Sequence, residues 1–275
     1  MNNFIGYYLG ELKKNNFSYP EIELKALLKF SSKINKDIFL NNISIKEINL
    51  NKFKLAFAKR LNKEPISKIT NKKEFWSCDF FVNEKVLDPR PETEFIIESV
   101  QKYFSNYNKF LKIADFGTGS GCLAIILAKL YKNSKITATD ISIDAINIAK
   151  QNSKKHKVND RISFFQCKWI NHINNFDLIV SNPPYLTNSS YEKSDKGIKF
   201  FEPKIAFNGG DDGLNAYREI AKKVFNLMHL NSYLILEIGY NQKKNVKKIF
   251  AKRGIRIVEI IKDYQSIDRV LVLKK

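Results

Sequence analysis

Cysteine is scarce in this sequence of 275 residues, which holds only three. Cys78, Cys122 and Cys167 lie far apart, and the chain has no Cys-x-x-Cys pair or His/Cys cluster. A disulfide framework and a zinc site are therefore not predicted, and we expect no metal. An odd number of separated cysteines is typical of a reducing compartment, so we expect a cytoplasmic protein.

Long apolar runs are also lacking. No stretch approaches the roughly 20 apolar residues that a membrane-spanning helix requires. Residues 1–14 have no basic segment ahead of an apolar one, so they do not predict a signal peptide. We expect no membrane partner. The chain is still 44% hydrophobic and 13% aromatic, which is enough for a packed core.

Arginine is rare although the chain is strongly basic. The formal net charge is +19, but only seven of the 47 basic residues are arginine. Proteins that read nucleic acids usually depend on arginine for bidentate contacts. The charge therefore permits an RNA-rich or acidic partner, but no direct contact with nucleic acid is required. No interface pattern stands out, and we expect a monomer.

Glycine is absent between Gly10 and Gly117, so no phosphate-binding loop precedes residue 117. Apolar residues at helical spacing follow Tyr19-Pro20-Glu21, and Ser44 with Glu47 forms a candidate capping box for a later helix. We predict a helical bundle over residues 1–72. An aromatic β-hairpin over residues 73–86 would link this bundle to a domain over residues 87–275.

From residue 111 onward, strands and helices alternate. Strands are predicted at 112–116, 135–140, 162–166, 177–181, 233–238, 255–261 and 270–273, with helices at 121–131, 142–157, 213–230 and 241–252. This alternation predicts an α/β fold with a seven-stranded, doubly wound sheet covered on both faces. The last two strands lack a helix between them and should pair antiparallel.

A glycine loop follows the first of these strands. It reads Asp115-Phe116-Gly117-Thr118-Gly119-Ser120-Gly121, and Asp140 ends the next strand. Glycines allow a sharp turn and a close approach of a ligand to the backbone. An acid at the Asp140 position can accept both hydroxyls of a ribose. These two features predict a nucleotide-like cofactor.

Two prolines end the fourth strand, in Ser181-Asn182-Pro183-Pro184-Tyr185. Proline donates no ladder hydrogen bond, so the strand must stop at Asn182, in the crevice where open α/β sheets bind ligands. The amide oxygen of Asn182 and the carbonyl of Pro183 can each accept one N–H of a planar NH2 group, and Tyr185 can lie over its plane. A plain turn is the alternative interpretation, but the upstream glycine loop favours a functional one.

Another proline pair brackets Arg90, in Asp88-Pro89-Arg90-Pro91-Glu92-Thr93-Glu94. The prolines hold this arginine on an extended backbone, and Pro91 starts a helix. The segment is either a linker before that helix or a wall of the active site.

Asp115, the glycine loop, Asp140 and Asn182-Pro183-Pro184-Tyr185 together resemble the seven-stranded methyltransferases that bind S-adenosylmethionine. With residues 74–77, 89–94, 201–203 and 209–214, the chain is similar to the HemK/PrmC family. That family methylates the glutamine of the Gly-Gly-Gln motif in peptide chain release factors. The resemblance spans nearly the full length and is strongest between Glu74 and Gly213.

The resemblance implies a role for each motif. Catalysis would involve Asn182, Pro183 and Tyr185, and substrate contacts would come from the same residues with Pro184 and Arg90. S-adenosylmethionine would be held by Asp115, Gly117, Thr118, Gly119, Ser120, Gly121, Asp140, Trp169 and Asn182. The helical bundle would recognise the substrate.

The chain departs from the family at Cys167-Lys168-Trp169. The family usually has an acid before the aromatic residue, so an acceptor for the adenine amino group is missing here. Either a backbone carbonyl replaces it or the affinity for the cofactor is reduced.

Other activities share part of this pattern. Asn-Pro-Pro-Tyr also occurs in amino-methyltransferases that act on nucleic-acid bases, and a sister branch modifies a glutamine of a ribosomal protein. Residues 89–94 favour the release-factor branch. A non-catalytic adaptor is disfavoured, because the glycine loop and Asn-Pro-Pro-Tyr are both intact. The resemblance thus implies a glutamine N5-methyltransferase for release factors, without identifying which release factors it modifies.

Overall fold

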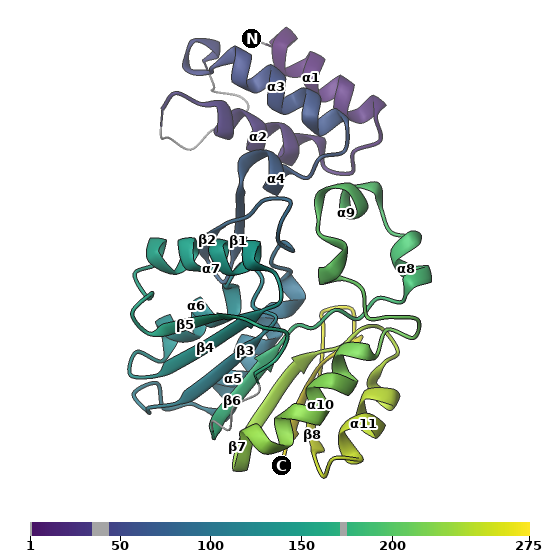
Figure 1. The fold of residues 1–275 in the computed structure, drawn as a ribbon. Helices are drawn as coiled ribbons and strands as arrows, with labels where there is room; N and C mark the ends of the chain where they lie inside the picture. The colour runs from purple at the N-terminus through teal and green to yellow at the C-terminus, as the bar shows by residue number, and fades with distance from the viewer. Residues whose placement is uncertain (1, 35–43, 171–174) are drawn as a thin grey trace. The chain divides into compact units, whose positions relative to one another are not determined.

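The computed structural model describes residues 2–34, 44–170 and 175–275, which form two compact units that divide at residue 72 (Figure 1). Within these ranges, no helix combines the length and the apolar character needed to cross a bilayer.

The first unit is helical. It contains α1 (Asn2–Lys14), α2 (Pro20–Ser31), a 3-10 turn (Ile45–Glu47), α3 (Leu50–Leu61) and α4 (Ile66–Thr70). Its core includes the fully buried Leu24, Leu27 and Phe53, which come from α2 and α3. Arg60 of α3 also donates to both carboxylate oxygens of Glu23 in α2. Apolar packing and this ion pair therefore hold the two helices together.

The capping box predicted at Ser44 is wrong. Ser44 precedes only the 3-10 turn, and its side chain makes no capping hydrogen bond. The N-cap of α3 is Asn49, whose side chain accepts from the backbone N–H of Lys52 at 3.1 Å. The chain reaches α3 from an extended Ile48, which is buried, and this places the N-cap of the helix five residues after Ser44.

The second unit contains a two-stranded sheet and a seven-stranded sheet. The smaller sheet pairs β1 (Lys72–Phe75) with β2 (Cys78–Phe81). The strands of the larger sheet are β3 (Lys112–Phe116), β4 (Lys135–Asp140), β5 (Ile162–Gln166), β6 (Phe176–Ser181), β7 (Met228–Glu237), β8 (Arg256–Lys262) and β9 (Asp268–Lys274). The helices are α5 (Glu94–Tyr103), α6 (Cys122–Leu130), α7 (Ile143–Lys155), α8 (Asn188–Glu192), α9 (Lys196–Phe201), α10 (Asn215–Leu227) and α11 (Lys243–Ala251).

The strand order β5-β4-β3-β6-β7-β9-β8 confirms the predicted seven-stranded sheet. The chain moves outward from β3 through β4 to β5, then crosses to the other side of β3 for β6 and β7. These five strands are parallel, and β9 lies antiparallel between β7 and β8. The reversal beside β3 is a topological switch point, where open α/β sheets bind their ligands.

Apolar cores cover both faces of the sheet, as predicted. One core contains buried residues of α5 and α6, and the other contains buried residues of α10 and α11. Figure 1 shows α10 and α11 side by side. Both cores include alternate residues of β6, such as Leu178 on one face and Ile179 on the other. β6 is therefore buried on both sides, which explains its continuous apolar sequence.

Two details of this unit differ from the prediction. α10 ends at Leu227 and β7 begins at once with Met228, because Met228 pairs with Phe176 of β6. The sequence predicts no helix between Tyr185 and Gly213, yet this segment contains the short helices α8 and α9. The side chain of Thr187 caps α8 by accepting from the N–H of Ser190.

The two candidate caps give a matched pair of variants. Asn49→Ala removes the acceptor for the Lys52 N–H, and we expect it to lower the free energy of unfolding by about 1 kcal/mol. Ser44→Ala removes no capping bond and should stay within about 0.5 kcal/mol of the parent. Urea titration followed by circular dichroism measures both values. A larger loss for Ser44→Ala would contradict the assignment.

Candidate active site

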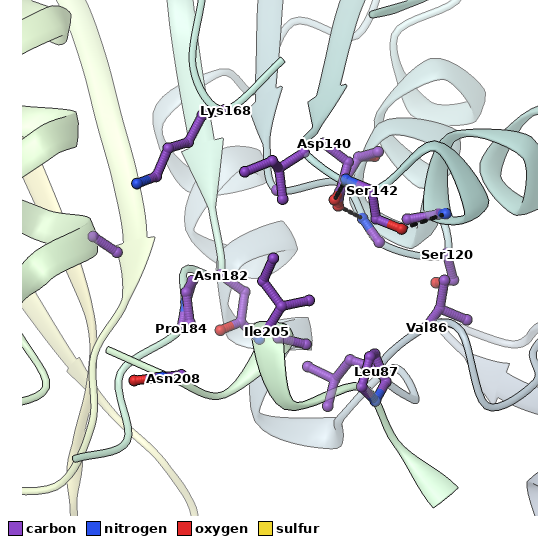
Figure 2. Close-up of a pocket in the computed structure, with 18 of the residues that line it drawn as sticks. Val86, Leu87, Ser120, Asp140, Ser142, Lys168, Asn182, Pro184, Ile205 and Asn208 are labelled. Atoms are coloured by element: carbon purple, nitrogen blue, oxygen red, sulfur yellow. Dashed lines mark hydrogen bonds between the residues drawn. The ribbon is translucent and has the colours of Figure 1, made fainter. Parts of the chain in front are cut away.

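A cavity of about 500 Å³ lies at the carboxyl ends of the parallel strands (Figure 2). Figure 2 shows Asp140 and Ser142 on one side of this hollow, with Asn182 and Pro184 on another. The volume lies within the range that small-molecule and cofactor sites occupy. Of the residues predicted for the site, the cavity wall contains Gly117, Thr118, Gly119, Ser120, Asp140, Trp169, Asn182, Pro184 and Arg90.

The glycine loop forms one wall and leaves open space in front of its backbone. Gly117 and Gly119 have φ values of +72° and +55°, and a Cβ atom at either position would meet no other atom within 4 Å. The N–H groups of Gly117 and Thr118 both donate to the carbonyl of Thr139 at the end of β4. The loop is thus fastened to the sheet while its glycines leave room for a ligand.

Asp115 lies beneath this loop rather than in the cavity wall. Its Oδ2 accepts from the Thr118 hydroxyl at 2.6 Å and from the Ala124 N–H at 3.2 Å. Its Oδ1 is buried and has no hydrogen-bond partner among the described residues. Burial raises the pKa of Asp115 to about 7, against the effect of both hydrogen bonds. Asp115 therefore shapes the loop, and its charge is sensitive to any cation in the cavity.

Asp140 does face the cavity. Its two oxygens accept one backbone N–H each, from Gly119 and Ser142, both at 2.9 Å. Burial raises the pKa of this carboxyl, and the backbone hydrogen bonds oppose the rise. Each oxygen keeps a lone pair for a further donor, so Asp140 can accept hydroxyl groups of a ligand.

Lys168 stands where the family usually has an acid, and a glutamate from a distant part of the chain lies beside it. Glu219 of α10 accepts from Lys168 Nζ and from Trp169 Nε1, both at 2.9 Å. All three side chains line the cavity. Burial favours the neutral acid, but the hydrogen bonds from Lys168 and Trp169 hold the pKa of Glu219 below its ordinary value. A carboxylate is therefore present beside Trp169, although the sequence there supplies a lysine.

A chain of hydrogen bonds fixes the amide of Asn182. Its Nδ2 donates to Thr93 Oγ1 at 2.9 Å, and the Thr93 hydroxyl donates to Glu237 Oε2 at 2.7 Å. Because the Thr93 hydroxyl donates its one proton to Glu237, its oxygen can only accept a hydrogen bond from Asn182. The amide oxygen of Asn182 accepts no hydrogen bond from the part of the chain that the structure describes. This oxygen is therefore an acceptor available at the cavity.

Pro183 and Tyr185 lie behind the wall. Pro183 is buried, and the Tyr185 hydroxyl donates to Glu237 Oε1 at 3.1 Å. The backbone carbonyl of Tyr185 accepts from Gln242 Nε2 at 2.9 Å. Gly121 is also outside the wall, at the start of α6. The predicted direct contacts of these three residues with a ligand stay predictions.

Arg90 lines the cavity on an extended backbone and forms an ion pair. Its Nη2 donates to Glu202 Oε1 at 2.5 Å, and the second oxygen of Glu202 accepts from the Asp88 N–H at 2.9 Å. Glu202 comes from the Phe201-Glu202-Pro203 segment. The two proline-containing motifs are thus joined at one edge of the cavity.

Thr93, Glu219 and Glu237 were not predicted as site residues. A signal for Glu237 existed, because it is an acid at the carboxyl end of a buried strand, as Asp140 is. Thr93 belongs to the motif at residues 88–94, from which the sequence predicts only Arg90 as a site residue. No group of three His, Cys, Asp or Glu side chains in the described ranges is arranged to hold a metal ion.

The model of a family described as methyltransferase small domain matches residues 84–202. A bifunctional methyltransferase of Rickettsia typhi is 38% identical over 95% of this chain, but the chain spans only 54% of that relative, about half its length. A methyltransferase structure from Pyrococcus furiosus superposes with a TM-score of 0.54 at 20% identity, covering 79% of this chain and 96% of that one. This likeness shows the fold alone.

A relative of matching length decides the family. The release factor glutamine methyltransferase of Buchnera aphidicola is 35% identical over 100% of this chain and 99% of its own length. This match confirms the resemblance that the sequence motifs carry. The chain belongs to the release factor glutamine methyltransferase family.

Proposed function

We propose that this protein transfers a methyl group from S-adenosylmethionine to the side-chain nitrogen of the glutamine in the Gly-Gly-Gln motif of peptide chain release factors. The observation that carries the proposal is the amide oxygen of Asn182, which the Thr93 and Glu237 hydrogen bonds leave as an acceptor at the cavity. A family relative of matching length has this activity in its name. Release factors act on ribosomes, so the proposal includes a cytoplasmic location.

The cavity fits S-adenosylmethionine, which supplies an electrophilic methyl group on a positively charged sulfur. Gly117 and Gly119 leave open space for the cofactor, which a side chain at either position would enter. Asp140 offers free lone pairs for the ribose hydroxyls. Trp169 follows β5, the strand beyond β4, and offers an aromatic surface for the base. The neighbouring Glu219 carboxylate supplies an acceptor for the adenine amino group.

The substrate nitrogen is a poor nucleophile, because its lone pair is delocalised into the amide carbonyl. In the proposed mechanism, Asn182 Oδ1 and the carbonyl of Pro183 accept its two N–H groups and turn the nitrogen toward the methyl group. Positioning of this kind supplies up to roughly 7–11 kcal/mol in intramolecular analogues. The two acceptors also stabilise the positive charge that develops on the nitrogen. No strong base is needed if the proton leaves after methyl transfer.

We also propose that the helical unit up to residue 72 recognises the release factor. It exposes large apolar side chains, including Tyr7, Tyr19, Ile22 and Leu55, each more than 60% exposed. A contiguous patch of exposed apolar side chains is typical of a surface that meets another protein, and the proposal requires these four to contribute to one.

Mass spectrometry of a release factor incubated with the enzyme and S-adenosylmethionine tests the proposal. We expect a gain of one methyl group on the Gly-Gly-Gln glutamine. In Asn182→Ala we expect kcat to fall by about 10²-fold or more, because an acceptor for the developing charge is lost, while the Kd for the donor changes by less than about threefold.

Asn133→Ala is the matched control, because Asn133 is exposed and lies before β4, at the amino ends of the strands. It should retain full activity. Methylation of RNA, DNA or a ribosomal protein in place of the release factor would refute the substrate assignment, and an Asn182→Ala enzyme with normal kcat would refute the mechanism.

Glu219→Gln tests the acceptor beside Trp169. The amide keeps one acceptor oxygen but loses the charge that binds Lys168, so we expect the Kd for S-adenosylmethionine to rise about three- to tenfold by calorimetry. Glu259→Gln, a change of the same type on β8, should leave the Kd unchanged. Equal affinity of the parent and Glu219→Gln would exclude Glu219 from donor binding.

Donor binding should strengthen as the pH rises. Asp115, with a pKa of about 7, is partly protonated below neutrality, and a cation in the cavity favours its ionised form. Binding must then release a proton, and the Kd should increase by up to about tenfold between pH 7 and pH 6. Calorimetry in buffers of different ionisation enthalpy measures this release. S-adenosylhomocysteine, which lacks the sulfonium charge, should show a weaker dependence, and a Kd that is constant over this range would contradict the expectation.

A further inference from the structure

Glu237 is the last residue of β7, and its side chain is 1% exposed. β7 pairs with β6 so that Leu236 lies opposite Ser181, which places Glu237 and Asn182 just beyond the same pair. The carboxylate accepts from Thr93 on one oxygen and from Tyr185 on the other, at 2.7 and 3.1 Å. One buried acid therefore connects to Asn182 through Thr93 and to Tyr185 directly.

We propose that Glu237 is a positioning residue for methyl transfer, which in its ionised form orients the Asn182 amide through Thr93 and anchors the Tyr185 hydroxyl. This inference rests on the proposed function, because it concerns the residues that hold the substrate glutamine. Glu237 itself does not line the cavity, so it is not placed to contact the donor or the reacting nitrogen.

The direction of the hydrogen bonds supports this role. An ionised carboxylate can only accept, so the Thr93 hydroxyl must donate to it and can then only accept from Asn182. That requirement directs the NH2 of Asn182 toward Thr93 and leaves its oxygen for the substrate. A protonated Glu237 can donate to Thr93 instead, and Thr93 can then donate to Asn182. The amide of Asn182 would rotate and present its NH2 to the substrate NH2, where no hydrogen bond forms.

The surroundings of Glu237 place this switch near neutral pH. Burial raises the pKa of Glu237 to about 7, while the hydrogen bonds from Thr93 and Tyr185 and the charge of Arg269 lower it and that of Glu92 raises it. Tyr217 donates to the backbone carbonyl of Glu237 at 3.1 Å, and Arg90 contributes a positive charge near Tyr185. Because the folded pKa is raised, the carboxylate is ionised above about pH 7 and neutral below it.

The test measures kcat and KM for release factor methylation from pH 5.5 to 8.5 in the parent, Glu237→Gln, Thr93→Val and Thr93→Ser. In the parent, kcat should fall about tenfold per unit below pH 7. Glu237→Gln mimics the neutral acid, so we expect its kcat at pH 8 to be at least tenfold lower and nearly independent of pH, with donor Kd within about threefold. Thr93→Val should lose activity similarly, and Thr93→Ser, which keeps the hydroxyl, should retain most of it.

One control variant separates this role from a general loss of structure. Glu259 also accepts from a tyrosine hydroxyl and a second donor, but on β8, so Glu259→Gln should keep the parent profile. Asp115 also has a pKa of about 7, so the parent profile alone does not identify Glu237. If the fall of kcat below pH 7 is absent in Glu237→Gln, that fall in the parent enzyme is assigned to Glu237.

A readout without turnover separates this inference from the proposed function. In ¹⁵N-labelled protein, the side-chain amide resonances of Asn182 should shift with a midpoint near pH 7 and lose that shift in Glu237→Gln or, if that variant does not fold, in Thr93→Val. A parent enzyme that methylates no release factor would refute the proposed function. Amide resonances that do not titrate, or a folded Glu237→Gln enzyme with the parent kcat and profile, would refute the role of Glu237.

Discussion

The register of β3 with its two neighbours controls where Gly117, Asp140 and Asn182 lie. Phe116, the last residue of β3, is opposite Thr139 of β4 on one side and Ser181 of β6 on the other. The residues that follow, Gly117, Asp140 and Asn182, therefore leave the sheet at one level. The buried hydroxyl of Ser181 donates to the carbonyl of Phe116 at 2.8 Å and fastens the ends of β3 and β6 together. A shift of one residue in the β3–β6 pairing would point Asn182 to the other face of the sheet, and the same shift between β3 and β4 would do so for Asp140.

The ionised forms of two buried acids near this end of the sheet lower the stability of the fold, although the proposed function uses them. Asp115 and Glu237 are both almost fully buried, and burial raises the pKa of each to about 7. A carboxyl whose folded pKa lies above its unfolded value stabilises the fold below the unfolded value and loses that contribution as the pH rises through 7. The unliganded chain therefore keeps both groups ionised above neutrality at some cost in stability. Active sites commonly carry such strained charges, and a bound cation relieves them.

The sequence predicted those parts of the molecule whose signals are local. Apolar runs ended by glycine or proline located the strands and the loop from Gly117 to Gly121, and the two prolines after Asn182 marked the end of β6. The helix predicted at 142–157 begins at Ser142, which is the N-cap of α7 and accepts from the Ala145 N–H with its side chain. These features depend on neighbours within about four residues, so a linear pattern contains them.

The remaining features depend on contacts between distant residues. Glu219 reaches Trp169 across 50 positions and Thr93 reaches Glu237 across 144, so no spacing rule reveals either pair. Glu219 shows that a charge absent from its usual place in the sequence can be restored by another helix. The early start of β7 also depends on the pairing of Met228 with Phe176, which competes with the helical tendency of the residues before it.

The position of β9 has a consequence for the integrity of the whole sheet. β8 pairs only with β9, and β9 in turn pairs with β7, where Val270 lies opposite Glu237. Proteolytic trimming of residues 268–274 would therefore detach two strands at once and turn β7 into an exposed apolar edge, which is prone to aggregation. It would also remove the backbone hydrogen bond from Ile238 to Arg269, immediately after the buried acid. Loss of β9 would thus remove the support behind Glu237, with every residue of the cavity wall still in place.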